Sequence, residues 1–252
     1  VKVGQDTPAI TPNITEDTLF KLNGEVVGFY LTKLPPDVSN LLKIANKEFN
    51  SKNVPKSEME RSSAVMRGYE QTGKRGIADV VQLSAILGGV PPRPHMRRPY
   101  PSVSSVHRHP EAKNFIKAML ALSKKTTEII KSHMPETAAH QIKQVSQAEK
   151  RFQFGDMFTS SISNYNIAAA YHRDTGNLPA SVNAIYTKRW QAKGGSLHVP
   201  EFNLCIEQSD ESLLVYPAWK SIHGVTPIEP LQKGGYRNSL VLYPLNAFIP
   251  KK

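Results

Sequence analysis

Two histidines and one aspartate in the C-terminal half of the chain could bind a metal ion. His172 and Asp174 are separated by one residue in the stretch YHRDTG, so in an extended strand their side chains point to the same face. His223 lies in a later short apolar run. Two imidazoles and one carboxylate from separate strands are the ligand set of the facial triad, which holds Fe(II) and leaves coordination positions open.

An arginine and a serine beyond this set could bind an acidic ligand. Arg237 begins the apolar run RNSLVLYPL, and Ser239 lies two residues later, on the same face of a strand. A guanidinium can pair with a carboxylate through two parallel hydrogen bonds, and a hydroxyl beside it adds a further donor. The pair is therefore suited to hold a dicarboxylic acid.

Other chemistry is open to the same residues. Two imidazoles and one carboxylate also suit zinc in a hydrolase, or another metal in a cupin-like site. Arg237 weakens the zinc alternative, because a zinc hydrolase has no need of it. Without any metal, His172 and Asp174 would be an ordinary polar pair at the end of a strand.

The elements that must position these residues are short strands. From residue 152 onward, β-branched and aromatic runs alternate with turn sequences such as RDTGN, AKGG and QKGG. The expected strands are 157–163, 165–172, 181–190, 195–199, 202–208, 212–217, 221–228 and 236–245. So many short strands in under about a hundred residues are typical of a β-sandwich or jelly roll.

The N-terminal half is mixed and more helical. Residues 24–34 have the composition of a strand, whereas residues 35–50 and 110–134 show helical spacing, with a further helical stretch to about residue 150. Residues 90–103 are rich in proline and arginine, which predicts an ordered loop or extended arm. We expect an α+β fold in which N-terminal helices support the β core.

This pattern predicts a division at residue 151. Residues 1–151 would form a helical and basic region that packs on the core, residues 152–252 would form the core itself, and we expect the two together to make one compact domain.

The composition indicates what kind of binding partner and compartment to expect. Lysine and arginine total 32 against 21 acidic residues, a formal charge of +11, which favours a polyanionic partner. The single cysteine, Cys205, excludes an intrachain disulfide and fits a reducing compartment. No apolar run reaches membrane-spanning length, and no signal pattern opens the sequence, so we expect a soluble intracellular protein, nuclear or cytoplasmic.

The ordered set of His172, Asp174, His223, Arg237 and Ser239 resembles the Fe(II)- and 2-oxoglutarate-dependent dioxygenases. The resemblance covers about residues 152 to 247. It implies a double-stranded β-helix, or jelly roll, and the use of Fe(II), O2 and 2-oxoglutarate as cosubstrate. It also implies that the two histidines and the aspartate bind iron, while Arg237 and Ser239 bind the far carboxylate of oxoglutarate.

A narrower resemblance is to the TET/JBP branch of this superfamily, which oxidises the 5-methyl group of pyrimidines in DNA. It is carried by KGGSLHVPEFN (193–203), which lies between the paired ligands and the distal histidine. The long N-terminal extension and the positive charge agree with it. The resemblance implies DNA as the partner, and a methyl group inside the duplex stack is reached only when its base is flipped out.

Several residues could contact such a substrate. Amides can donate to and accept from a pyrimidine edge, aromatic rings can stack on it, and arginines on a proline-stiffened arm can follow phosphates. These candidates are Asn164, Tyr165, Asn166, Asn183, Tyr186, Arg97 and Arg98. The alternative for each is a solvent-facing strand or loop residue.

Two other functions remain open from the sequence. A protein side chain or a small metabolite could replace DNA as the substrate of the same dioxygenase chemistry. The chain could also be a catalytically silent, basic nucleic-acid-binding protein on the same fold. The sequence does not choose between thymine and 5-methylcytosine, and it does not predict how far oxidation goes.

Overall fold

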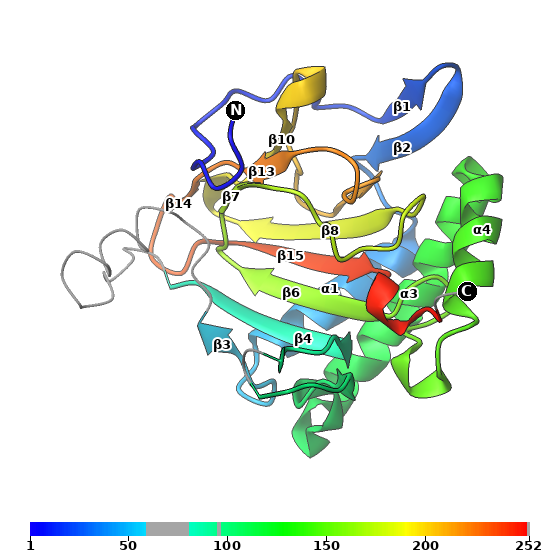
Figure 1. Ribbon diagram of the computed structural model, residues 1–252. Helices are drawn as coiled ribbons and strands as arrows, with labels where there is room; N and C mark the ends of the chain where they lie inside the picture. Colours follow the sequence, from blue (N-terminus) through cyan, green and yellow to red (C-terminus); the bar gives the residue numbers. More distant parts are fainter. Residues whose placement is uncertain (59–80, 95–96, 251–252) are drawn as a thin grey trace.

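The computed structural model describes residues 1–58, 81–94 and 97–250 (Figure 1). Its helices are α1 (Pro36–Asn50), α3 (Lys113–His133) and α4 (Pro135–Val145), with 3-10 turns at Val106–Arg108, Pro110–Ala112, Lys150–Phe152, Pro200–Phe202 and Asn246–Phe248. None of the described helices is long and apolar enough to cross a membrane. His95 and Met96 of the proline-rich arm lie outside the described residues.

Nine of the described strands form one antiparallel sheet, which we call the main sheet. They are β1 (Thr18–Leu22), β2 (Glu25–Leu31), β3 (Ser57–Glu58), β4 (Leu83–Val90), β5 (Ser102–Val103), β6 (Ser160–Tyr165), β8 (Asn183–Trp190), β12 (Ser212–Tyr216) and β15 (Tyr236–Tyr243). Their order is β1-β2-β12-β8-β15-β6-β4-β3, with β5 paired to β4. Strands from both sides of residue 151 share this sheet, and the division into two regions stays a prediction.

Four strands form a second layer, which we call the small sheet. In order they are β11 (Leu204–Ile206), β10 (Leu197–Val199), β13 (His223–Val225) and β7 (Ala169–His172). The strands β9 (Ala192–Gly194) and β14 (Ile228–Pro230) form a separate ribbon. Two facing antiparallel sheets whose neighbouring strands are distant in sequence make a jelly roll. The eight short strands expected after residue 152 are all present, whereas the ribbon was not expected.

The helices cover one face of the main sheet (Figure 1). Leu240 and Leu242 of β15 are fully buried in the same apolar cluster as Phe115 and Met119 of α3. Because side chains alternate along a strand, Arg237 and the other odd-numbered residues of β15 point to the opposite face, toward the small sheet. The α+β fold with supporting helices is confirmed, and α1 and α3 nearly coincide with the expected helices.

A segment near the N-terminus, residues 4–14, crosses the small sheet from edge to edge, and we call it the N-terminal strap. At β7, the Gly4 amide donates to Tyr171 O (2.8 Å), the Tyr171 amide donates to Gln5 O (2.9 Å), and the Thr7 hydroxyl donates to Ala169 O (2.8 Å). At β11, the Asn13 and Ile14 amides donate to Cys205 O. The strap therefore closes both edges of the small sheet.

Candidate active site

A cavity of about 350 Å³ lies between the main and small sheets. Its lining comes from inward-pointing side chains of β6, β7, β8, β13 and β15 and from the loop after β7. Arg173, Thr175 and Gly176 of that loop are exposed and mark the mouth of the cavity. A concave site with an apolar wall and a few polar groups is typical of small-molecule binding.

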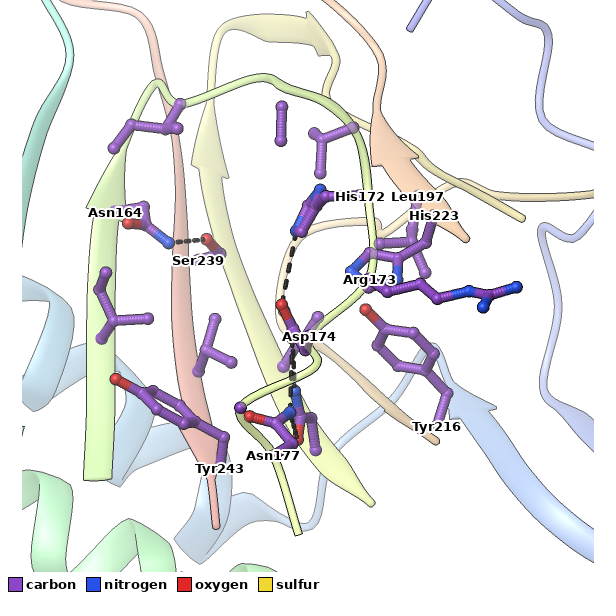
Figure 2. Close-up of a pocket in the computed structure, with 18 of the residues that line it drawn as sticks. Asn164, His172, Arg173, Asp174, Asn177, Leu197, Tyr216, His223, Ser239 and Tyr243 are labelled. Carbon is purple, nitrogen blue, oxygen red and sulfur yellow. Dashed lines mark hydrogen bonds and ion pairs between the residues drawn. The ribbon is translucent and has the colours of Figure 1, made fainter. Parts of the chain in front are cut away.

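The three expected metal ligands meet in this cavity. One ligand atom from each of His172, Asp174 and His223 lies within 4.8 Å of the others. The two histidines face each other across the β7–β13 pair, with ring centroids 4.4 Å apart. His172 is the last residue of β7 and Asp174 lies beyond the strand end, yet Asp174 Oδ1 is 3.5 Å from His172 Nε2 (Figure 2).

The backbone sets the tautomer of both histidines. His172 Nδ1 is 2.8 Å from Ala170 O, and His223 Nδ1 is 3.0 Å from Ser221 O. A carbonyl can only accept, so each Nδ1 carries a proton, and in the neutral ring each Nε2 then carries the lone pair. Two imidazole Nε2 atoms and one carboxylate oxygen fit a divalent metal of the facial-triad type.

Asparagine side chains hold the carboxylate of Asp174. Asn183 Nδ2 donates to Asp174 Oδ2 (3.1 Å), and Asn177 Nδ2 donates to Asn183 Oδ1 (2.9 Å) and lies 3.5 Å from Asp174 Oδ2. These bonds occupy Oδ2 and leave Oδ1 directed toward His172. Such hydrogen bonds to ligand side chains orient them and tune metal affinity.

Arg237 is buried in the same cavity, with 2% of its surface exposed. Its Nη2 donates to Gln208 Oε1, and its Nε has no hydrogen-bond partner among the described residues. Burial, together with the neighbouring Arg189 guanidinium, lowers the pKa of Arg237 to about 9. A buried cation with an unused donor favours an anionic ligand, because the ligand would compensate the charge.

Ser239 lies beside Arg237 on β15, as the spacing predicted. Asn164 Nδ2 donates to Ser239 Oγ (3.3 Å), while Asn164 Oδ1 is buried and has no hydrogen-bond partner in the part of the chain that the structure describes. In Figure 2, this pair lies across the cavity from His172 and Asp174. A single cavity thus has metal ligands on one side and an arginine with a hydroxyl on the other.

Two glycines shape the wall behind Arg237. Gly194 and Gly195 both have φ of +72°, a conformation that other residues rarely adopt. A Cβ at Gly194 would lie 1.9 Å from Pro227 O, and one at Gly195 would lie 3.1 Å from Arg237 Cδ and Nε. The Gly-Gly turn of the KGG motif therefore lets the backbone approach the arginine.

Two of the expected substrate residues are turned away from the cavity. Tyr186 is fully buried on the helix side of β8, where its hydroxyl lies 2.9 Å from Thr126 Oγ1, and burial raises its pKa. Tyr165 stacks on Tyr236 and packs against the same helix-side cluster. The prediction that they contact substrate was wrong, because strand alternation directs Asn183 and Ile185 inward instead.

Two of the expected amides are already engaged. Asn166 has a left-handed φ of +54°, and its Oδ1 accepts from the Arg237 amide (2.8 Å), so it closes the end of β6 against β15. Asn183 donates a hydrogen bond to Asp174 through its Nδ2 and accepts one from Asn177 through its Oδ1. Asn166 does not line the cavity, whereas Asn183 and Asn164 do. The role of these amides as base readers stays a prediction. Arg97 and Arg98 are exposed, and their contact with a substrate stays a prediction.

Other residues of the site were not expected from the sequence. They are Gln208, Asn177 and Tyr216, which line the cavity, and Arg189, which lies behind it. Asn177 had one readable signal, because an Asp-x-x-Asn turn follows the strand and such residues bond locally. Gln208 had no such sequence signal, since its position depends on the path of the loop between β11 and β12.

Comparisons with known proteins agree with this geometry. Residues 93–246 match the Tet_JBP family, the oxygenase domain of the 2OGFeDO superfamily. The solved structure of NgTET1 in complex with 5mC DNA is similar, with a TM-score of 0.60 and 13% identity over 91% of this chain and 76% of that chain. A C-terminally truncated T7H from Neurospora crassa in apo form has a TM-score of 0.40 and 16% identity over 87% and 84%. No curated protein matches the chain by sequence.

Proposed function

Because the chain belongs to the Tet_JBP family of 2OGFeDO oxygenases, we propose that it oxidises the 5-methyl group of thymine or 5-methylcytosine in DNA. It is an Fe(II)- and 2-oxoglutarate-dependent dioxygenase, since the superfamily uses these cofactors with O2 and the cavity holds a His-Asp-His triad. In the overall reaction, one oxygen atom of O2 enters succinate as CO2 is released, and the other enters the substrate as a hydroxyl group.

One observation carries the proposal. The triad of His172, Asp174 and His223 shares a cavity with the buried guanidinium of Arg237. Neither feature alone is specific, because histidines with a carboxylate also suit zinc and a buried arginine also serves structural roles. Together they match a chelated 2-oxo acid whose other carboxylate is held at a distance from the metal.

The residues of this chain have distinct roles in the proposed reaction. His172, Asp174 and His223 would hold the iron, which supplies oxygen activation when bound. Arg237 and Ser239 would bind the distal carboxylate of oxoglutarate and so fix the orientation of its 2-oxo acid end. Apolar lining residues keep water from the reacting atoms; they include Ile162, Ile185, Leu197 and Val241.

DNA as the substrate is supported by charge and by one structural neighbour. The formal charge is +11, and the exposed Arg97 and Arg98 could contact phosphates. NgTET1, whose fold is similar, was solved with 5mC DNA. In the proposed reaction the flipped base would enter through the mouth of the cavity, and Asn164 Oδ1, which has no hydrogen-bond partner among the described residues, would be an acceptor for it.

The test is incubation of the protein with Fe(II), ascorbate and oxoglutarate on two DNAs, one with thymine as its only 5-methylpyrimidine and one that also contains 5-methylcytosine. Mass spectrometry of the digested nucleosides should show a hydroxymethylpyrimidine, and succinate should form in step. His172→Ala should abolish both products, whereas His140→Ala, at an exposed site on α4, should not.

The two other functions give different results. Succinate without any oxidised nucleoside would contradict DNA as the substrate and favour a protein side chain or metabolite. Absence of succinate with every DNA, although DNA is retained in a gel, would favour a silent binding protein. Turnover that persists in His172→Ala would contradict the metal assignment.

A further inference from the structure

A glutamine side chain occupies the arginine end of the cavity. Gln208 lies in the loop between β11 and β12, with 1% of its surface exposed and a left-handed φ of +52°. It lines the cavity together with Arg237 and Ser239. A glutamine in this backbone conformation is uncommon, so the surrounding contacts must hold it there.

The contacts of Gln208 determine which way its amide points. Its Oε1 accepts from Arg237 Nη2 and from the Thr187 hydroxyl (3.1 Å). A guanidinium can only donate, so the atom that faces it must be the oxygen. Gln208 Nε2 is therefore on the other side of the amide, where it is buried and has no hydrogen-bond partner among the described residues.

A second arginine strengthens the positive field at this point. Arg189 lies opposite Arg237 in the register of β8 and β15, and its Nη2 donates to Gly194 O (2.7 Å). Within the described part of the chain, neither guanidinium forms an ion pair with an acidic residue, and the Nε of each is buried without a partner. Unused donors on one buried and one half-buried guanidinium favour a carboxylate ligand.

We propose that Gln208 is a further cosubstrate-binding residue, whose Nε2 donates to the distal carboxylate of oxoglutarate while its Oε1 fixes the fork of Arg237. This inference rests on the proposed function, in which Arg237 and Ser239 bind that carboxylate. With Gln208, three side chains surround the carboxylate. They would select a 2-oxo acid that has a second carboxylate over one that lacks it.

The test compares oxoglutarate with pyruvate, which has the same chelating end but no distal carboxylate. Binding of each to the Fe(II)-loaded protein is measured without O2, by calorimetry. Gln208→Met should weaken oxoglutarate binding about ten- to a hundredfold, the effect of one lost hydrogen bond to a charged group. Gln208→Glu should weaken it more, because the new carboxylate pairs with Arg237 and repels the ligand.

Controls separate this inference from the proposed function. Both variants should bind pyruvate as the unsubstituted protein does, which also shows that they are folded. Gln232→Met, at an exposed turn, should change neither affinity. Unchanged oxoglutarate binding in Gln208→Met, or an equal loss of pyruvate, would overturn the role of Gln208. Failure of the proposed function is a different result: the unsubstituted protein itself would bind oxoglutarate no more tightly than pyruvate.

Discussion

The amide of Asn183 donates a hydrogen bond of 3.1 Å to Asp174 Oδ2, and its own oxygen accepts one of 2.9 Å from Asn177. The carboxylate of a metal ligand is thus held by a chain of two amides that starts on the main sheet. The position of Asp174, which lies beyond the end of β7, depends on this chain and on its backbone bond to Ala218 O. Asn183 therefore links the metal site to the rigid part of the fold.

We predict that Asn183→Leu lowers metal affinity. Leucine has a similar volume but cannot donate to Asp174 Oδ2, so the carboxylate loses its orientation. Loss of such a contact typically costs 10- to 100-fold in metal affinity. Anaerobic titration with Fe(II), in the absence of oxoglutarate, measures the change.

Asn164→Leu is the matched control in the same cavity, because Asn164 bonds Ser239 and none of the metal ligands. Its affinity for Fe(II) should equal that of the unsubstituted protein. If Asn183→Leu also binds Fe(II) normally, the amide chain has no part in positioning Asp174.

Gly195→Ala should disturb the cosubstrate end and spare the metal. The new Cβ would lie 3.0 Å from Ile228 Cγ1 and 3.1 Å from Arg237 Cδ and Nε, so the arginine side chain would have to shift away from it. We expect the oxoglutarate concentration for half-maximal turnover to rise on the order of tenfold. Gly234→Ala is the control, since its φ is also positive but its Cβ would meet nothing within 4 Å. Equal effects of the two substitutions would assign the change to backbone strain alone.

Tyr186→Phe should affect stability and leave DNA binding unchanged. The Tyr186 hydroxyl is buried and bonded to Thr126 Oγ1 between β8 and α3. Removing it should lower the free energy of unfolding by about 1 kcal/mol. Urea unfolding of Tyr186→Phe, Thr126→Val and the double variant measures the coupling between the two hydroxyls. Weaker DNA binding by a folded Tyr186→Phe would restore the tyrosine as a substrate contact.

His107 should make stability depend on pH. Its Nδ1 accepts from the Gly88 amide (3.0 Å), and burial lowers its pKa below the ordinary value of about 6.5. Below that value the unfolded chain takes up a proton that the folded histidine does not, so the free energy of unfolding falls as pH falls through about 6.5. Above it, both states are neutral and the contribution is complete.

Urea unfolding at two pH values, near 7.5 and near 5.5, measures this dependence. The two values lie on either side of the ordinary histidine pKa. The comparison is with His107→Asn, whose amide oxygen can still accept from Gly88 but does not titrate. A pH dependence of the same size in both proteins would show that other groups cause it.

The exposed arginines of the proline-rich arm should contribute to DNA binding through charge alone. If Arg97 and Arg98 each contact one phosphate, replacing both with alanine should lower the slope of log affinity against log salt by about 1.8. Lys117→Ala with Lys131→Ala, on α3 behind the main sheet, removes the same charge as a control. Equal slopes for the two double variants would contradict a specific role for the arm.

Arg237 and Ser239 were predictable from the sequence because residues two apart on a strand share a face, and the apolar run around them shows where the strand is. His172, Asp174 and His223 were predictable from their residue types and their order in the chain, which resemble those of the dioxygenases; the strand rule does not place Asp174, which lies beyond the end of β7. The structure places the three ligands together and Arg237 in the same cavity. The fold class followed from the same runs and from the turn residues between them.

The inward or outward direction of single residues was not predictable in the same way. Asn183 and Tyr186 both lie on β8, but only the pairing of β8 with β12 and β15 decides that the first faces the cavity and the second the helices. The cosubstrate role inferred for Gln208 depends on a contact across 29 residues of sequence, to Arg237. Such contacts arise from tertiary packing, which local composition does not encode.

The N-terminal strap has a consequence for self-association. Its bonds to Tyr171 and Ala169 occupy the outer edge of β7, the strand that carries His172. A chain shortened to begin after residue 8 would present that edge as a template for another copy, as bare strand edges do. Loss of iron and the growth of oligomers should then appear together, because β7 supplies both the metal ligand His172 and the unpaired edge.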